Sequence, residues 1–236
     1  TLNLTATELD KNEHLRRELI ANVSHDLRTP LTMIIAYAEV MRDLPGENSP
    51  ENVQVVIDEA QRLTNLVNDM LDISKLQAGV MNMDITEYNL TESIESVFAR
   101  YNKLNEQEGY TINIEYGEKV AIRADEYKIF QVIYNLVNNA INYTGESKTV
   151  IIRQRILGDV VRIEVIDDGE GIAPEALQYV WNRYYKVDKT HKRALMGTGL
   201  GLSIVREIIR AHDQKIDVIS TKGVGSEFIF TLDRAE

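Results

Sequence analysis

The sequence predicts an α+β protein in which an N-terminal helical hairpin is followed by a C-terminal α/β sandwich. Apolar residues recur at spacings of three and four through residues 9–43 and again through residues 50–79, which is the pattern of amphipathic helices. After Gly79 the pattern changes to short strands alternating with helical segments, a mixture typical of helices packed on one sheet. The chain therefore contains two structurally different parts.

The two predicted helices of the N-terminal part are separated by turn residues between Leu44 and Pro50. Pro50 suits the first turn of the second helix, and Gly79 suits its C-terminal cap. A hairpin of two such helices cannot bury both apolar stripes, so we expect two chains to pair as a four-helix bundle, that is, a homodimer. The stripes contain Leu15, Leu19, Val23, Leu27, Leu31, Ile34, Ala38 and Met41 in the first helix, and Val53, Val56, Ala60, Leu63, Val67 and Met70 in the second.

The C-terminal part is predicted to contain helices and strands in alternation, joined by turns. The helices are expected at residues 91–107, 126–143 and 200–212, and the strands at residues 111–116, 150–156, 160–166, 215–220 and 227–232. Residues 80–87 show neither pattern and are interpreted as a linker. We therefore expect a helical domain at residues 1–79, a linker at 80–87 and an α/β domain at 88–236.

The composition excludes several classes of protein. A net charge of −11 argues against a general nucleic-acid binder, which carries a broad basic face. The chain has no cysteine, so disulfides and thiolate metal sites are excluded. No apolar run is long enough to span a bilayer, no signal peptide is visible, and the first residue is Thr1 rather than methionine. We expect the chain to be a piece of a longer protein.

His25 is a candidate phosphoryl acceptor on the first predicted helix. At about 100° per residue, its side chain points roughly 160–200° away from Val23 and Leu27, and therefore into solvent. Asp26 flanks the ring, and a hydrogen bond to one ring nitrogen would raise the nucleophilicity of the other. Thr29 lies one turn later on the same face. A histidine on a helix surface is most often only a solvated residue, so these neighbours decide the assignment.

Three segments of the C-terminal part have the residue types of a nucleotide site. Asn135 and Asn139 lie one turn apart on a predicted helix, and amide oxygens are acceptable ligands for Mg²⁺. Asp167 follows an apolar strand and begins the run Asp-Asp-Gly-Glu-Gly, so its carboxylate can accept a hydrogen bond from an adenine amino group. Residues 197–201, Gly-Thr-Gly-Leu-Gly, lead into a helix whose N-terminus favours phosphate.

Each of these segments has a simpler interpretation when it is taken alone. Paired asparagines are more often part of a solvated helix face, and a Gly-x-Gly-x-Gly run is often only a turn and a helix cap. The glycine run is not a Rossmann fingerprint, because it comes late in the chain and no acidic residue follows at the expected distance. A Walker lysine is also absent. The segments gain their meaning from their combination.

The octapeptide at residues 24–31, Ser-His-Asp-Leu-Arg-Thr-Pro-Leu, resembles the H box of sensor histidine kinases. The resemblance implies that His25 accepts the γ-phosphoryl group of ATP and that Asp26 is its acid/base partner. It also implies that Thr29 orients water when the same protein dephosphorylates its partner. Residues 1–79 would then form the dimerisation and phosphoacceptor domain.

The segments at residues 135–140, 167–172 and 197–204 resemble the N, G1 and G2 boxes of the Bergerat-type ATP-binding domain. Residues 180–188 look like the F box, with Trp181 and tyrosines replacing the usual phenylalanines, and residues 223–228 resemble the last glycine box. The resemblance covers most of the chain, in the right order and spacing. It implies that the C-terminal part is an α/β sandwich of the Bergerat ATPase type that binds ATP with Mg²⁺.

The same resemblance implies roles for individual residues. Asn139 would bind Mg²⁺, Asn135 would help to hold the phosphates or the metal, and Asp167 would bind adenine. The lid over ATP is expected at residues 186–196, whose basic side chains would attract the triphosphate. The complete set implied for ATP is Asn135, Asn139, Tyr143, Asp167, Gly169, Gly171, Arg183, Lys186, Gly197, Thr198, Gly199, Leu200 and Gly201.

Two positions depart from the family pattern. Asn142 stands where the family often has a basic residue that touches phosphate, so phosphate neutralisation would rest more on the lid, Arg183 and Mg²⁺. Asp213 and Gln214 stand where the family often has a glycine pair. Aspartate tolerates the left-handed backbone conformation better than most residues, so we expect Asp213 to form a structural cap.

The resemblance implies the cytoplasmic core of a sensor histidine kinase, with the full-length protein anchored in a membrane through its missing N-terminal part. It implies an enzyme that phosphorylates its own His25 with Mg-ATP, passes the group to an aspartate of a response regulator receiver domain, and also dephosphorylates that regulator. The alternatives are another ATPase of the same fold, which would lack the histidine hairpin, a non-catalytic dimeric scaffold, and a protein that acts chiefly as a phosphatase. The sequence is compatible with phosphorylation of His25 by its own subunit and with phosphorylation by the partner subunit.

Overall fold

The computed structural model describes residues 2–77, 82–99, 101, 109–185 and 199–235, and for residues 2–22, 76 and 77 it describes the backbone alone. The chain divides into two compact units, Thr1–Lys75 and Leu76–Glu236. The described residues of the first unit form helices, and those of the second form helices packed on a sheet, which confirms the predicted α+β fold. No described helix is long and apolar enough to cross a membrane.

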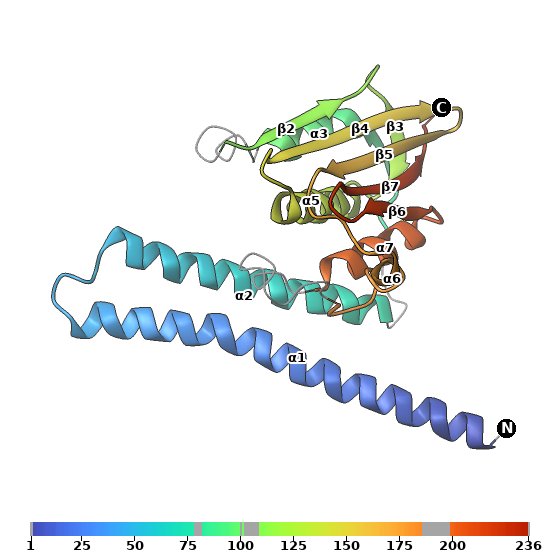
Figure 1. Cartoon of the computed structure of the whole chain (residues 1–236). Helices are drawn as coiled ribbons and strands as arrows, with labels where there is room; N and C mark the ends of the chain where they lie inside the picture. The colour runs from blue at the N-terminus through green and yellow to red at the C-terminus, as the bar shows by residue number, and fades with distance from the viewer. Residues whose placement is uncertain (1, 78–81, 100, 102–108, 186–198, 236) are drawn as a thin grey trace. The chain divides into compact units, whose positions relative to one another are not determined.

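The first unit is a hairpin of two long helices, α1 (Leu2–Asp43) and α2 (Pro50–Gln77), which run in opposite directions (Figure 1). Gly46 has a φ of 93° in the turn between them. Ser49 caps α2 by accepting a hydrogen bond from the backbone N–H of Asn52 at 3.2 Å. The predicted start of the first helix at residue 9 is too late, because a helix that has formed extends through further residues at little cost.

The apolar residues of the hairpin form two rows on each helix instead of the single predicted stripe. In α1, Val23 and Ile34 are half-buried, whereas Leu31 and Ile35 are 48% and 50% exposed. α2 carries a similar exposed row, and its members are Val53, Ile57, Val67 and Leu71. A single hairpin therefore leaves one apolar row of each helix in contact with solvent.

The second unit is built on a five-stranded sheet with the strand order β2-β4-β5-β7-β6. β2 pairs with β4 in parallel, and the other neighbours are antiparallel. The strands are β2 (Thr111–Glu115), β4 (Thr149–Leu157), β5 (Val160–Asp167), β6 (Ile216–Thr221) and β7 (Gly225–Asp233). A separate antiparallel pair is formed by β1 (Thr86–Asn89) and β3 (Ala121–Ala124).

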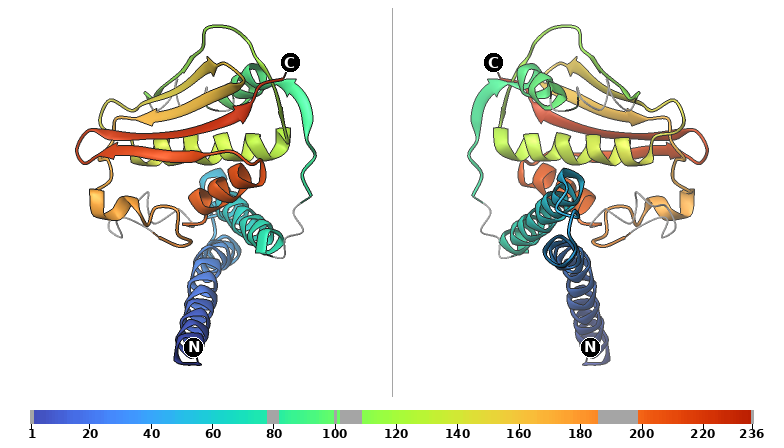
Figure 2. Two further views of the ribbon diagram at one scale, coloured as in Figure 1. Left: turned by 90° about the vertical axis from the view of Figure 1, so that its right-hand side faces the viewer. Right: turned by 90° about the vertical axis from the view of Figure 1, so that its left-hand side faces the viewer.

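Helices cover one face of the five-stranded sheet. α5 (Glu126–Tyr143) lies against this face, and α7 (Gly201–Ala211) and α3 (Leu90–Ala99) pack against α5 (Figure 2). The alternation of a strand places Ile163 and Val165 of β5 in the core, while Arg162 and Glu164 point to the open face. A short helix, α6 (Pro174–Leu177), follows β5.

The sequence pattern does not predict β1, β3 or α6, because each is only four residues long and has too few positions to show a period. β1 begins within the predicted linker. The helix predicted at residues 91–107 ends at Ala99 in the described part of the chain, and residues 102–107 lie outside it, as does Gly79. The remaining helices and strands begin and end within about two residues of the predicted limits, the usual uncertainty of such boundaries.

The N-terminal end of α5 and the C-terminal end of α7 are joined through His212. Its Nε2 accepts a hydrogen bond from the backbone N–H of Asp125 at 3.0 Å, and its Nδ1 lies 2.8 Å from the carbonyl oxygen of Ile208. The Asp125 carboxylate in turn caps α5 through the N–H of Lys128 at 3.0 Å. Asp213, which follows, has a φ of 56°, so the predicted left-handed cap is confirmed.

Candidate nucleotide site and phosphoacceptor histidine

His25 lies on the exposed side of α1, as predicted. Its side chain is 78% exposed, and its Nδ1 lies 3.4 Å from Oδ1 of Asp26, whose side chain is 25% exposed. The hydroxyl of Thr29 donates a hydrogen bond to the carbonyl oxygen of His25 at 3.2 Å, so both residues are on one face of the helix. Pro30 lies within α1 and has no N–H to donate to the preceding turn. The ring nitrogen that does not face Asp26, Nε2, is open to an incoming reactant.

The second unit brings three of the predicted nucleotide residues onto one helix, α5. Asn135, Asn139 and Tyr143 follow one another at intervals of one turn, and all three are half-buried. Asn138, which precedes Asn139, is engaged elsewhere: its Oδ1 accepts a hydrogen bond from the hydroxyl of Tyr101 at 2.9 Å.

Asn135 has an unsatisfied polar atom at the start of α7. The position of a Cβ on Gly201 would lie 3.7 Å from its Oδ1, which places the amide beside the N-terminus of that helix. Its Nδ2 is buried and has no hydrogen-bond partner among the described residues. A buried donor without a partner costs about 1–3 kcal/mol. The free N–H groups of Nδ2 therefore suit a ligand with acceptor oxygens, such as a phosphate.

Asp167 ends β5 as a buried carboxylate, only 4% exposed. Oδ1 accepts a hydrogen bond from the N–H of Gly169 at 2.9 Å, and the backbone N–H of Ser226 lies close enough to the carboxylate to favour its charged form. Burial raises the pKa of Asp167 to about 6, although these two N–H groups act in the opposite direction. The two backbone donors fix the orientation of the carboxylate and leave it able to accept from a ligand.

The loop after Asp167 depends on two glycines. A Cβ on Gly169 would lie 1.7 Å from the carbonyl oxygen of Tyr143, at the end of α5. Gly171 has a φ of 63°, and a Cβ there would lie 2.0 Å from the carbonyl oxygen of Thr221 in β6. The absence of side chains lets the loop touch both α5 and the β6–β7 hairpin. The predicted residues on α5 and after β5 are therefore brought together.

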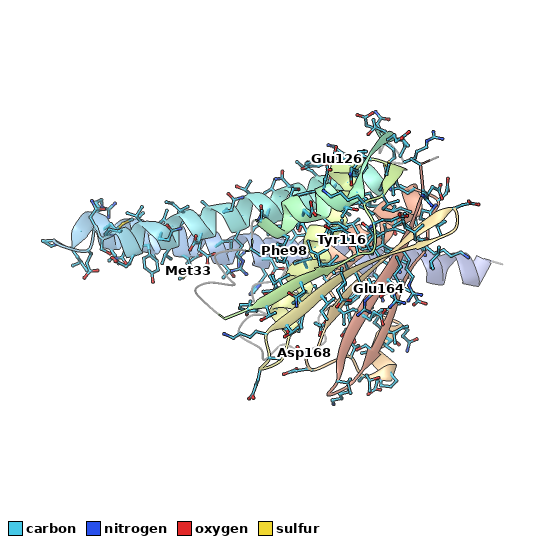
Figure 3. All side chains as sticks on the ribbon, turned by 90° about the horizontal axis from the view of Figure 1, so that it is seen from above. Met33, Phe98, Tyr116, Glu126, Glu164 and Asp168 are labelled. Atoms are coloured by element: carbon cyan, nitrogen blue, oxygen red, sulfur yellow. The ribbon has the colours of Figure 1, made fainter. Side chains whose placement is uncertain are left out.

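Sequence reasoning missed a second support for this loop, centred on Asp168. Its side chain accepts hydrogen bonds from the hydroxyls of Thr144, at 2.7 Å, and of Ser147, so it ties the segment after α5 to the end of β5. Burial by itself would raise the pKa of Asp168, but the hydrogen bonds from Ser147 and Thr144 outweigh it and lower the pKa. Asp168, labelled in Figure 3, directly follows the last residue of β5. The contacts join positions far apart in sequence, so no local pattern could have revealed them.

The glycine run before α7 is described only from Gly199 onward. The carbonyl oxygen of Gly199 accepts a hydrogen bond from the N–H of Tyr184 at 2.8 Å, and Leu200 is fully buried. Arg183 is half-buried. Burial lowers the pKa of Arg206 on α7, and the charges of Arg210 and Arg183 act in the same direction, while Glu207 opposes them.

Several predicted residues lie outside the described part of the chain. They are Lys186, Gly197, Thr198 and the remainder of the predicted lid at residues 186–196. Asn142, which stands in place of a basic residue, is half-buried on α5. Within the described residues, no group of three or more His, Cys, Asp or Glu side chains could hold a metal ion.

Two family models match the chain. Residues 15–79 match the His Kinase A (phospho-acceptor) domain, and residues 124–236 match the histidine kinase-, DNA gyrase B-, and HSP90-like ATPase. The sensor protein SrrB of Staphylococcus aureus is 34% identical over 234 residues, which cover 95% of this chain and 40% of SrrB. The chain thus spans about two fifths of the length of this relative.

Solved structures of histidine kinases are similar as well. The catalytic domain of ThkA is 32% identical, with a TM-score of 0.57 over 64% of this chain and 97% of that one. ThkA in complex with the response regulator protein TrrA is 26% identical, with a TM-score of 0.68 over 97% of this chain and 65% of that one. Full-length ShkA in complex with AMPPNP is 26% identical, with a TM-score of 0.69 over 92% of this chain and 46% of that one.

These matches fall on the unit that carries His25 and on the unit that carries Asn135 and Asp167. The chain belongs to the sensor histidine kinases of two-component systems and corresponds to their catalytic core, with a HisKA domain and an HATPase_c ATP-binding domain.

Proposed function

We propose that this chain transfers the γ-phosphoryl group of ATP to His25 and then to an aspartate of a response regulator receiver domain. The observation that carries the proposal is the presence in one chain of an exposed His25 beside Asp26, of a buried, hydrogen-bonded Asp167, and of an unsatisfied donor on Asn135 at the start of α7. Catalysis would rest on positioning and electrostatics, as in other phosphoryl transfers.

The nucleotide would bind between α5, the loop after β5 and the start of α7. Asp167 would accept a hydrogen bond from the adenine amino group, and Tyr143 would pack beside the base. The phosphates would meet the backbone of residues 197–201 and the buried Nδ2 of Asn135, with Arg183 and Lys186 supplying positive charge. The AMPPNP complex of ShkA supports a nucleotide at this fold.

The side-chain oxygens of Asn139 and Asn135 would hold Mg²⁺, which would supply positive charge to the phosphate oxygens when bound. Both amides are half-buried on one face of α5, and amide oxygen is a suitable donor for this hard cation. Removal of the metal with EDTA is therefore expected to abolish labelling of His25.

The chemical step would start from the ring nitrogen of His25 that faces away from Asp26. As Nε2 forms a bond to the γ-phosphorus, the bond from that phosphorus to the bridging oxygen breaks and ADP leaves. The positive charge that develops on the ring is stabilised by Asp26, whose Oδ1 lies 3.4 Å from Nδ1 and can accept the Nδ1 proton.

The partner of the reaction would be a response regulator. ThkA was solved with the response regulator protein TrrA, which supports a receiver domain as the acceptor for this chain. Thr29, on the same face as His25, would orient water for dephosphorylation of that regulator. We further propose, from the resemblance to sensor histidine kinases, that the full-length protein is anchored in a membrane; SrrB, of which the chain covers two fifths, is a longer sensor protein.

Labelling with γ-³²P-labelled ATP tests the central step. We expect the wild-type chain to acquire acid-labile, alkali-stable label, and the His25→Gln variant to lose all label while it still binds nucleotide. Persistent label in this variant would overturn the assignment of His25. If the wild type binds no Mg-ATP, the scaffold interpretation replaces the kinase.

Two further comparisons separate the remaining alternatives. Thr29→Ala should retain autophosphorylation but lose most of the dephosphorylation of a phosphorylated regulator; equal loss of both would contradict the role of Thr29. Mixing His25→Gln chains with Asp167→Asn chains tests the direction of transfer, because label beyond that of Asp167→Asn chains alone appears only when one subunit phosphorylates the other.

A further inference from the structure

The β6–β7 hairpin supports both ends of the loop at residues 167–172. At the first end, Asp167 is the cross-strand partner of Ser226 in the sheet, and the backbone N–H of Ser226 lies close enough to the Asp167 carboxylate to lower its pKa. At the second end, the N–H of Ile172 donates a hydrogen bond of 2.8 Å to the hydroxyl oxygen of Ser220. Ser220 and Ser226 are themselves cross-strand partners. One pair of serines therefore connects the two ends of the loop.

The hydroxyl of Ser220 uses its full hydrogen-bonding capacity. A hydroxyl has one proton to donate and two lone pairs to accept with. The proton goes to the carbonyl oxygen of Gly225 at 2.8 Å. The 3.0 Å contact with the hydroxyl of Ser226 must then be donated by Ser226, and the remaining lone pair accepts the N–H of Ile172.

These bonds lie in a part of the unit that water reaches poorly. Ser226 is 8% exposed and Asp167 is 4% exposed, and Ser220 is half-buried between the strands. Loss of the Ser220 hydroxyl would leave the N–H of Ile172 and the carbonyl of Gly225 without this partner. Because unpaired buried polar groups are costly, the loop at residues 167–172 would shift until these two groups form other hydrogen bonds.

We propose that Ser220 is a positioning residue that holds Asp167 in the orientation needed to select adenine. The inference rests on the proposed role of Asp167 in nucleotide binding and adds how that carboxylate is held. Ser220 acts through Ser226 on the Asp167 carboxylate and through Ile172 on the far end of the loop, and it does not touch the nucleotide.

The test compares ADP with inosine diphosphate, which has an oxygen in place of the adenine amino group. The whole chain is titrated with each nucleotide by calorimetry, and the wild type is expected to prefer ADP. Ser220→Ala should weaken ADP binding by about tenfold, the effect of one well-placed hydrogen bond, and leave inosine diphosphate binding unchanged. The preference for ADP then falls by the same factor. Ser220→Thr retains the hydroxyl and should restore the preference.

Ser96→Ala is the matched control, because the Ser96 hydroxyl donates within α3, to the carbonyl oxygen of Ser93 at 2.7 Å, and contacts none of the loop residues discussed above. It should leave both affinities unchanged. An equal loss for both nucleotides in Ser220→Ala indicates general loosening and overturns the proposal, and so does an unchanged preference. If the wild type binds neither nucleotide, the proposed function fails and this inference fails with it.

A double variant tests the route through Asp167 directly. Asp167→Asn alone should reduce the preference for ADP, and adding Ser220→Ala should cause no further loss; independent, additive losses would overturn the proposed coupling. If Ser220→Ala does not fold, Ser226→Ala provides the measurement, since it removes one of the three bonds of Ser220. It should reduce the preference in the same direction but less, and an unchanged preference overturns the proposal.

Discussion

Asp167 combines two opposing demands on one side chain. Burial removes water from the carboxylate, which strengthens any hydrogen bond that it accepts from a ligand but makes its charge costly. The consequence is the pKa of about 6, which the N–H groups of Gly169 and Ser226 do not bring back to the ordinary range. Asparagine has the same shape and an acceptor oxygen, but no charge to bury.

Replacement of Asp167 by asparagine should therefore stabilise the nucleotide-free protein at neutral pH while it impairs nucleotide binding. The folded pKa of about 6 lies above the value of 3.8 expected for the unfolded chain. Protonation of Asp167 therefore stabilises the folded state of the wild type below pH 4, and this contribution is lost as the pH rises through 6. The gain of Asp167→Asn over wild type should grow between pH 4 and pH 7 to on the order of 3 kcal/mol.

Fluorescence of Trp181 provides the measurement. It is the one tryptophan in the sequence, and its ring packs edge-on against Phe228 with centroids 5.8 Å apart, so it reports unfolding of the second unit. Asp159→Asn removes the same formal charge from an exposed turn and is the control. A stability difference between wild type and Asp167→Asn that does not change with pH would contradict the assigned pKa.

Local pattern was sufficient for some site residues and insufficient for others. The exposure of His25 follows from helix geometry, and the glycines after Asp167 follow from the run in which they stand, so both could be predicted. Asp168 and Ser220 could not, because their roles arise from contacts with residues far away in the sequence, such as Thr144 and Ile172. A serine in a strand, such as Ser220, and an aspartate in a turn, such as Asp168, are common, so their residue types gave no signal.

At the scale of elements, the open face of the sheet is stabilised by a chain of ion pairs that crosses four strands. Glu164 of β5 lies at its centre, with its side chain 2% exposed, 3.2 Å from Nη1 of Arg153 and 2.8 Å from Nε of Arg162 (Figure 3). Arg153 also contacts Glu115 of β2 at 2.6 Å, and Arg162 contacts Glu227 of β7 at 3.7 Å. The arginines cover the carboxylate, which explains how a charged side chain on an open face is buried.

Replacement of Glu164 by alanine should destabilise the second unit by roughly 1–3 kcal/mol. The value is below that of a fully buried pair because the two arginines are about one third exposed and can be solvated after the change. Urea denaturation followed by Trp181 fluorescence measures it. Glu115→Ala removes an exposed partner of the same Arg153 and should cost less than about 1 kcal/mol. Equal costs for the two variants would contradict the central role of Glu164.

The elements themselves were predictable in proportion to their length. α5 shows its period over five turns, and its predicted limits agree with the observed ones, whereas the four-residue strands β1 and β3 depend on pairing with each other. The single apolar stripe predicted for α1 separates into two rows for a similar reason. The pattern shows which residues are apolar, but it does not show which surface each row packs against. Leu31 and Ile35 are an example, since they stay exposed in the single hairpin.

At the scale of the whole molecule, the exposed rows favour the pairing of two chains. Ile35 of α1 and Ile57 of α2 are 50% and 53% exposed, and neither is needed for the core of the second unit. The second unit has its own sheet and helices and is stabilised independently. The state of assembly and the ability to bind nucleotide should therefore respond to different mutations.

Replacement of Ile35 by glutamate should convert a dimer to a monomer without loss of ADP binding. The variant places a charged side chain in a desolvated interface and removes an isoleucine from it. Because the dimer is two-fold symmetric, both chains carry the change, and its energetic cost is doubled. Ile35 is 50% exposed in the hairpin, so loss of the remaining isoleucine burial alone corresponds to about 1.5–3 kcal/mol per dimer, or at least about tenfold in the dissociation constant. Sedimentation equilibrium measures the mass, and Ala36→Glu, on an exposed position of the same helix about 100° away from Ile35, is the control. A wild type that sediments as a monomer, or an Ile35→Glu variant that remains a dimer, would show that this row is not the interface.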